Sequence, residues 1–154
     1  MRAVTMDHPG IKSIFRDYRF GLAILAAPVF RLIVHRFDLE TFKFGASPET
    51  MSQILLLLLA YPVLEEIVFR MGLQGMLART GIGVKSRAGI SIANLGASLI
   101  FAAFHLLSQP FALGAAIFFP SLIFGFFRDR YGSILPGIIL HCWYNASFIV
   151  FLNP

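Results

Sequence analysis

The chain has 154 residues and a mass of 17.1 kDa; 57% of its residues are hydrophobic and only 14% are charged. Because soluble domains contain about 45–50% apolar and about 25% charged residues, this composition excludes a disordered chain, a coiled coil and an ordinary soluble globule. The net charge is +5, but Lys and Arg are too sparse for the basic stripe of a nucleic-acid-binding protein, and the single cysteine, Cys142, excludes an internal disulfide and a cysteine-based metal cluster. We therefore expect one membrane-embedded domain with no nucleic-acid partner.

Five apolar segments follow in chain order, and each is a candidate membrane-spanning helix. They cover residues 20–34, 51–77, 89–107, 111–127 and 133–152. The first and the fourth are short for a spanning helix, which needs about 20 residues. The sequence predicts an all-α fold, a polytopic transmembrane helix bundle of about five spans. We expect a single domain over residues 20–154, preceded by a cytoplasmic or interfacial segment over residues 1–19.

The basic residues outside these segments predict the orientation of the chain. Nine lie on one side, namely Arg2, Lys12, Arg16, Arg19, Arg79, Lys85, Arg87, Arg128 and Arg130, and two on the other, namely Arg36 and Lys43. Because cytoplasmic loops carry the excess of Lys and Arg, the N-terminus is predicted to be cytoplasmic and the C-terminus outside. We expect an integral protein of the bacterial inner (plasma) membrane, with membrane lipids as partners. Residues 11–20 are expected to form an interfacial amphipathic turn, with its arginines at the lipid head groups.

Three charged residues, Glu65, Glu66 and Arg70, lie inside the second apolar segment. Each costs about 2.5–3.5 kcal/mol near the bilayer centre, so each needs a partner, water or a chemical role. Glu66 and Arg70 are four residues apart on one helix face, which predicts an intrahelical ion pair with a bidentate bond. Glu65 lies about 100° around the helix and has no cation three or four residues further on. It therefore needs a partner from another helix, and His105 is the best candidate.

Polar residues also interrupt the third and fifth segments. His105 lies near the end of the third, and His141 and Asn145, four residues apart, share a face of the fifth. With a rise of about 1.5 Å per residue, all three fall at the depth of Glu65. A single histidine or asparagine in a membrane is more often a group that joins two helices by a hydrogen bond. Their occurrence together in one layer predicts a site.

A glutamate and a histidine in a dry site can polarise one water molecule, with the carboxylate as general base. A second histidine and an asparagine can donate hydrogen bonds to a developing oxyanion. The chain has neither a G-x-S-x-G nor an H-E-x-x-H motif. The pattern therefore predicts water-mediated acyl transfer without a covalent intermediate. One glutamate with two histidines can also ligate zinc, so a metal site of Glu65, His105 and His141 stays open.

Three motifs occur in order on successive apolar segments. They are E-E-x-x-x-R at residues 65–70, F-x-x-x-H at residues 101–105 and H-x-x-x-N at residues 141–145. Together they resemble the CPBP family of intramembrane proteases, which includes the type II CAAX prenyl endopeptidases and bacteriocin-processing and immunity-type proteins. The resemblance covers about residues 55–151.

This resemblance implies a role for each matching residue. Glu65 and His105 would activate the water, His141 and Asn145 would form the oxyanion hole, and the remaining Glu66 and Arg70 would organise the site. It implies a glutamic-type intramembrane endopeptidase without a cofactor, which cleaves a membrane-anchored protein or peptide near its C-terminal region. A zinc-dependent protease that uses the same residues is the alternative.

The small size of the chain and the run from Phe119 to Pro136 also resemble small bacterial members associated with C-terminal sorting tags, the JDVT-CTERM type. Such enzymes are thought to remove a C-terminal membrane anchor from exported proteins. Two other classes of function stay open. One is a non-catalytic membrane immunity or scaffold protein. The other is a small transporter or proton relay, since buried Glu and His also mark ion paths, although the internal symmetry that many transporters show is not apparent.

Overall fold

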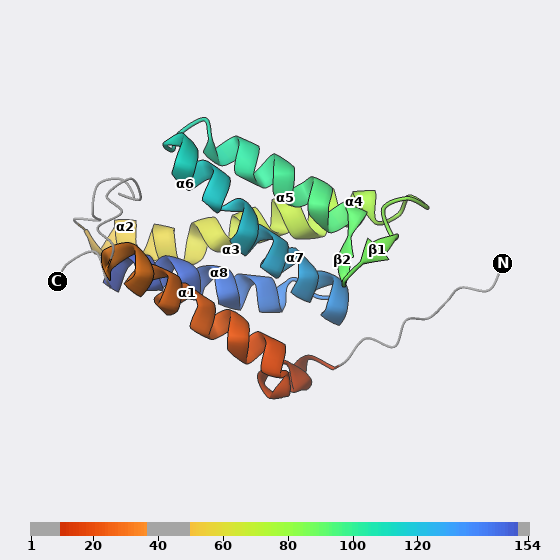
Figure 1. Cartoon of the computed structure of the whole chain (residues 1–154), viewed down its shortest axis with the longest axis horizontal. Coiled ribbons are helices and arrows are strands. Elements are labelled where there is room, and N and C mark those ends of the chain that lie inside the picture. Colours follow the sequence, from red (N-terminus) through yellow and green to blue (C-terminus); the bar gives the residue numbers. More distant parts are fainter. Residues whose placement is uncertain (1–9, 37–49, 151–154) are drawn as a thin grey trace.

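The computed structural model describes residues 10–36 and 50–150, which form a helix bundle with one very small β-hairpin (Figure 1). A 3₁₀ helix, Ile11–Arg16, precedes the first α-helix. The α-helices are α1 Tyr18–Arg36, α2 Met51–Leu55, α3 Tyr61–Glu65, α4 Gly75–Leu77, α5 Ile92–His105, α6 Phe111–Ala116, α7 Phe118–Tyr131 and α8 Leu135–Val150. The strands β1, Ser86–Arg87, and β2, Ile90–Ser91, pair in antiparallel fashion. The predicted all-α class is confirmed.

The second apolar segment is one continuous helical stretch over residues 51–77, but it is not a regular α-helix. Two π-helical stretches, Leu56–Ala60 and Glu66–Gln74, join α2, α3 and α4. The stretch begins with a capping box, in which the Thr50 hydroxyl and the Gln53 side chain each accept a backbone N–H of the other. π-Helical turns are rare and often lie at functional sites. Both motif residues Glu66 and Arg70 lie in the second π stretch.

The expected boundaries shift at two of the connections. The β-hairpin occupies the residues before Ile92, so α5 begins three residues later than the apolar run, and the Ser91 hydroxyl caps it by accepting the backbone N–H of Asn94 at 2.9 Å. The fourth segment extends through Arg130 to Tyr131, because charged residues continue the helix until Gly132 ends it with a φ of 60°. Residues 1–9, 37–49 and 151–154, with the predictions that fall on them, lie outside the described part of the chain.

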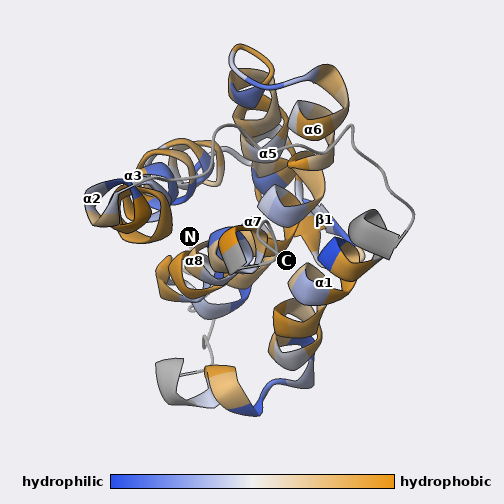
Figure 2. Ribbon diagram, turned by 90° about the vertical axis from the view of Figure 1, so that its left-hand side faces the viewer, coloured by the Kyte–Doolittle hydropathy of each residue, from blue (hydrophilic) through white to orange (hydrophobic). Residues whose placement is uncertain are grey.

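The distribution of polarity is the reverse of that in a soluble protein. Large apolar side chains are exposed, among them Leu22, Leu25, Leu59, Val68 and Met71, whereas Glu66, Arg70, Gln74 and Asn94 are fully buried. Figure 2 shows hydrophobic residues over most of the helical ribbons. Within the described residues, one helical stretch, Phe111–Tyr131, is long and apolar enough to cross a membrane; Ile92–His105 is apolar but shorter. The count of about five spans stays a prediction.

The N-terminal part of the chain packs against the last helix. Trp143 Nε1 donates a hydrogen bond to the Ile24 carbonyl at 2.8 Å, and the Tyr144 hydroxyl donates one to the Ala23 carbonyl at 3.0 Å. Ile14 and Phe20 are buried in the hydrophobic core. The expectation that residues 11–20 lie at the lipid surface is therefore wrong for these two side chains, since their burial against α7 and α8 removes them from any solvent.

Candidate active site

Four predicted site residues line one cavity of about 790 Å³. Glu65 is the last residue of α3 and His105 the last of α5, while His141 and Asn145 lie one turn apart on α8. The structure therefore brings together side chains from three segments far apart in the sequence. The rest of the wall is largely apolar and includes Phe30, Leu57, Tyr61, Phe101, Leu113, Ile117, Phe124, Tyr144, Phe148 and Ile149.

His141 lies between two carboxylates. Its Nε2 is 3.4 Å from Glu65 Oε2, and its Nδ1 is 3.3 Å from Glu66 Oε1. The ring stacks on Phe124, with ring centroids 5.0 Å apart. Each ring nitrogen therefore faces one carboxylate oxygen, and the two glutamates fix the orientation of the ring.

The sequence predicts His105 as the partner of Glu65, and the structure differs on this point. The imidazole in direct ion-pair range of Glu65 is that of His141, while His105 interacts with the carboxylate over a longer electrostatic range. The difference arises because His105 Nδ1 is already held, 2.9 Å from the Phe101 carbonyl oxygen one turn earlier. A carbonyl only accepts, so Nδ1 carries the hydrogen and Nε2 of the neutral ring keeps its lone pair.

Phe101 holds this arrangement from inside the bundle. The side chain is 1% exposed, and its ring centroid lies 4.5 Å from the ring of His105 and 6.0 Å from that of His141. The guanidinium of Arg70 lies 5.7 Å from the same ring, within the range of a cation–π contact. The motif phenylalanine is therefore a packing residue of the site and does not face lipid.

The predicted ion pair between Glu66 and Arg70 is present, but it is not bidentate. Arg70 Nε lies 3.6 Å from Glu66 Oε2, and both side chains are fully buried. The other guanidinium nitrogens are engaged elsewhere: Nη1 donates to Gln74 Oε1 and to Ser98 Oγ, each at 3.3 Å, and Nη2 donates to Ser121 Oγ. Of the three guanidinium nitrogens, only Nε is left to face the Glu66 carboxylate. Arg70 thus joins three helical segments beneath the site.

Asn145 is held by the backbone carbonyl of Leu57, and this carbonyl has no hydrogen-bond donor in its own helical stretch. Asn145 Nδ2 donates to the Leu57 carbonyl at 2.8 Å. In an α-helix the donor to Leu57 would be Tyr61 N–H, but this group bonds to the Leu56 carbonyl in the π stretch. In a π-helix the donor would be residue 62, and Pro62 has no N–H. Asn145 therefore satisfies this carbonyl, and its second amide hydrogen is left for the cavity.

Sequence reasoning missed a buried polar network below Arg70. Gln74 Nε2 donates to the Gly125 carbonyl at 3.0 Å and to Asp129 Oδ1 at 2.8 Å. Asn94 Nδ2 donates to the Leu122 carbonyl at 2.9 Å, and Asn94 Oδ1 accepts from Ser98 Oγ at 3.1 Å. A signal for this network exists in the sequence. Residues 91, 94 and 98 are polar in an apolar helix, and their spacing of three and four continues to the motif residues 101 and 105.

The described residues contain no group of three His, Cys, Asp or Glu side chains that could hold a metal ion. The zinc set of Glu65, His105 and His141 lines one cavity but is not arranged as such a group. Both ring nitrogens of His141 face carboxylates, and His105 offers only Nε2 as a lone pair. A histidine whose Nδ1 faces a carbonyl or a carboxylate is also the form that binds metal through Nε2, so the zinc alternative stays a prediction.

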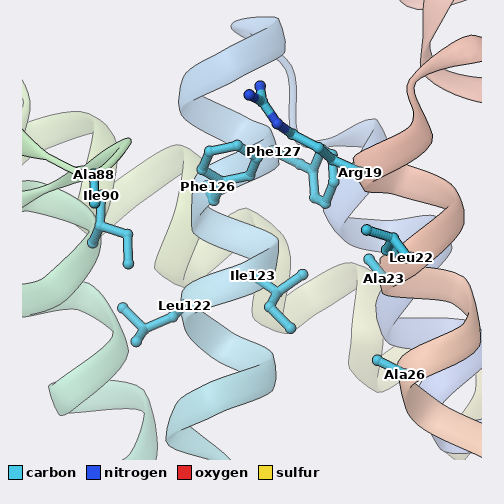
Figure 3. A pocket seen from close by; sticks show the side chains of 10 residues that line it. All are labelled: Arg19, Leu22, Ala23, Ala26, Ala88, Ile90, Leu122, Ile123, Phe126 and Phe127. Carbon is cyan, nitrogen blue, oxygen red and sulfur yellow. The ribbon is translucent and has the colours of Figure 1, made fainter. Parts of the chain in front are cut away.

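A second pocket of about 400 Å³ lies between α1 and α7 (Figure 3). Its walls are apolar except for Arg19, and none of the predicted site residues reaches it. Ala26 and Ile123 line both pockets and so lie between them. The predicted site residues Glu65, His105, His141 and Asn145 all lie at the larger cavity.

The three motifs and the cavity agree with a comparison against known protein families. The sequence model of the family described as Type II CAAX prenyl endopeptidase Rce1-like matches residues 47–147, which is well over half of the chain and contains all three motifs. Comparisons with curated proteins and with solved structures find no match. The resemblance to the JDVT-CTERM type stays a prediction. The chain belongs to the Rce1-like family of type II CAAX prenyl endopeptidases, which are integral membrane peptidases.

Proposed function

We propose that the chain is a glutamic-type intramembrane endopeptidase that hydrolyses a peptide bond near the C-terminal region of a membrane-anchored protein. The observation that supports this proposal is the convergence of Glu65, His105, His141 and Asn145 on one cavity. Glu65 is the accessible one of the two motif glutamates: its side chain is 31% exposed, whereas that of Glu66 is 0% exposed. A base that must meet a water molecule and a substrate needs that access.

In the proposed reaction, the Glu65 carboxylate and the Nε2 lone pair of His105 hold one water molecule. Glu65 takes a proton from this water as its oxygen adds to the peptide carbonyl carbon, and the carbonyl oxygen becomes an oxyanion. The C–N bond then breaks, and the proton on Glu65 passes to the departing amine. Atoms and charge balance, and no covalent intermediate with the protein forms.

The oxyanion needs hydrogen-bond donors aimed at one point, which often supply the largest electrostatic contribution. Asn145 has one amide hydrogen that is not used by Leu57, and His141 lines the same cavity, with its Nε2 3.4 Å from Glu65 Oε2. We assign the oxyanion contacts to these two side chains. Glu66 and Arg70 act as positioning residues, because they fix His141 from behind and lie outside the cavity wall.

The proposed substrate follows from the wall of the cavity. Beyond the polar residues, the wall consists mainly of Phe, Leu, Ile and Ala side chains. Such a surface favours apolar residues on either side of the cleaved bond, because their burial gains about 25 cal/mol per Å² of apolar area. This fits a hydrophobic segment that also anchors the substrate in the membrane.

The proposal is tested by co-expression with tagged, membrane-anchored candidate substrates and mapping of the cut site. Glu65→Gln and His105→Ala are each expected to lower cleavage by about 10²–10⁴-fold, the usual contribution of general acid–base catalysis. Lys85→Gln, an exposed change remote from the cavity, is the matched control and should cleave as the parent does. Full cleavage by the Glu65→Gln variant would show that this residue is not the base.

The zinc-dependent alternative has one supporting observation: its three ligands line the same cavity. Exhaustive chelation separates the two mechanisms. Activity that survives chelation, in protein without stoichiometric zinc, supports the glutamic mechanism. Activity that is lost on chelation and restored by zinc alone would favour the metalloprotease.

A further inference from the structure

The second pocket lies beside the larger cavity and has walls from three elements. Figure 3 shows α1 on one side, α7 in the middle and the β-hairpin on the other side. Leu22 and Ala26 line the pocket and are exposed, so the pocket is open along α1. Its volume of about 400 Å³ falls within the range of about 300–1,000 Å³ that is usual for ligand pockets. Because the chain belongs to a family of integral membrane peptidases, the molecules that meet this opening are those of the bilayer.

The pocket has one polar end and one apolar end. Figure 3 shows the Arg19 side chain reaching from α1 toward α7, next to Phe126 and Phe127. Ala26 and Ile123, which also line the larger cavity, lie at the other end. Arg19 and Ala26 are seven residues apart on one helix, which separates the two ends by about 10 Å. A ligand that fits this pocket has a charged head and an apolar chain.

The positive charge at the polar end has no carboxylate partner from the protein. Asp17, two residues before Arg19, pairs with Arg130, whose Nε lies 2.6 Å from Asp17 Oδ2. Within the part of the chain that the structure describes, no carboxylate pairs with the Arg19 guanidinium, which lies over the Tyr18 ring, 5.4 Å from its centroid. Exposed basic side chains near a bilayer surface attract anionic lipids. The polar end is therefore complementary to the phosphate of an anionic lipid.

The β-hairpin forms a fixed wall of the pocket. Its two-residue turn, Ala88 and Gly89, has a positive φ at both positions, 52° and 82°. Turns of this type usually have Asn, Asp or Gly at the first position, so Ala88 gives the pocket an apolar wall at a conformational cost. Ser91 Oγ donates to Asp129 Oδ2 at 2.6 Å and so holds the hairpin to α7. The pocket is therefore part of the fold and does not depend on a loose connection.

We propose that this pocket binds an anionic phospholipid, with the lipid phosphate at Arg19 and one acyl chain between α1 and α7. The chain ends at Ala26 and Ile123, so the bound lipid adjoins the larger cavity. Bilayer tails are as apolar as the pocket wall, so an acyl chain gains little by entering it, and the selectivity comes from the head group. The inference does not depend on the proposed peptidase function, because lipid binding needs no substrate.

Native mass spectrometry of the purified full chain in detergent counts the bound lipids and measures the affinity of the first one. Phosphatidylglycerol and phosphatidylcholine with the same acyl chains are titrated separately, so that only the head group differs. We expect phosphatidylglycerol to bind about fivefold more tightly, the usual contribution of one basic residue near an anionic lipid. Arg19→Gln is expected to remove this preference. Arg79→Gln, an exposed change outside the pocket, is the matched control and should keep it.

A pair of tryptophan variants on α1 tests the position of the acyl chain. Leu22 lines the pocket and Leu25 does not, although their exposures are similar, at 61% and 59%. Leu22→Trp is expected to fill the pocket and to remove the tightest binding event for phosphatidylglycerol. Leu25→Trp should leave that event unchanged. Circular dichroism checks that the helix content of each variant matches that of the parent.

Each of four other results would overturn the inference. Equal affinity of the parent for the two lipids would mean that ordinary bilayer lipid covers the pocket. A preference for phosphatidylglycerol that survives Arg19→Gln would place the head group elsewhere, and unchanged binding by Leu22→Trp would do the same for the acyl chain. A dimer of the parent that Leu22→Trp converts into a monomer would assign the pocket to a second copy of this chain.

Discussion

The bundle has an open half, around the cavity that Glu65 lines, and a filled half, around the buried network of Glu66, Arg70, Gln74 and Asn94. The two halves meet at the adjacent residues Glu65 and Glu66. The side chain of Glu65 is 31% exposed at the wall of the open half, whereas that of Glu66 is fully buried in the filled half. One residue turns a helix by about 100°, so neighbours of the same type face opposite environments. Glu65, which protein covers only in part, is the glutamate that we propose as the base. The covered one serves to hold its surroundings.

The same contrast applies to the other polar side chains. In the filled half, the donors of Gln74 and Asn94 have protein acceptors, as buried polar groups in folded proteins nearly always do. In the open half, His105 Nε2 and the second amide hydrogen of Asn145 face the cavity. Substitutions in the filled half should therefore change stability, and those in the open half should mainly change cleavage.

The largest expected effect on stability is that of Arg70→Met. This change leaves Glu66 charged and buried without its cation and removes the donor to Ser98 and Ser121. Breaking a buried ion pair from one side costs about 3–5 kcal/mol. The free energy of unfolding in detergent, from a denaturant titration, measures it.

A double-mutant cycle sharpens this result. Glu66→Gln combined with Arg70→Met removes both charges, so the pair should cost less than the sum of the two single changes. Costs that simply add would mean that the two side chains are not coupled, and the description of the filled half as an interlocked network would be wrong.

A smaller effect is expected of Gly125→Ala. A Cβ at this position would lie 1.9 Å from Asn94 Oδ1 and 2.8 Å from Gln74 Oε1, and both side chains are fixed by hydrogen bonds. Overpacking of this kind costs about 1–3 kcal/mol. Gly21→Ala is the matched control, since its Cβ would meet no atom within 4 Å. Thermal unfolding of the two variants should diverge, with Gly21→Ala at or above the parent.

Asn145→Ala should cost about 1–3 kcal/mol, because the Leu57 carbonyl loses its donor. Replacing Pro62 by Ala restores a backbone N–H that can bond to this carbonyl. The stability cost of Asn145→Ala is therefore expected to be smaller in a Pro62→Ala background. Cleavage should stay low in both backgrounds, since the proposed oxyanion contact is lost in either. Recovery of cleavage along with stability would show that Asn145 acts only as a structural group.

The sequence was sufficient for the helical class, the four cavity residues and the pair of Glu66 and Arg70, because each depends on local spacing. Residues four apart on a helix must share a face, and charged groups in apolar segments must converge. The π stretches were not predictable in this way. In the first of them, Leu56–Ala60, the Leu57 carbonyl is satisfied by the side chain of Asn145, which is distant in the sequence.

The partner of Glu65 was missed for a related reason. Depth along each helix placed His105 and His141 in one layer, but depth says nothing about which imidazole is already bonded. The Phe101 carbonyl holds His105 Nδ1, and Glu66 draws His141 to within reach of Glu65. Such competition between partners is decided by tertiary geometry and has no signature in residue spacing.

The smallest expected effect belongs to Asp17, at the edge of the filled half. Burial alone would raise the pKa of this carboxyl, but hydrogen bonds from Arg130, the Arg19 backbone N–H and Tyr131 outweigh burial and lower it from 3.8. A lowered pKa contributes stability that is complete above the unfolded-state pKa and is lost as the pH falls through the folded-state pKa. The parent should therefore lose stability below about pH 4 more steeply than Asp17→Asn. Near neutral pH the variant should lose no more than about 1 kcal/mol, since Arg130 is 34% exposed. A loss of stability as large as that of Arg70→Met would contradict this expectation. Burial would then not explain why the pair of Arg70 and Glu66 is stronger than that of Arg130 and Asp17.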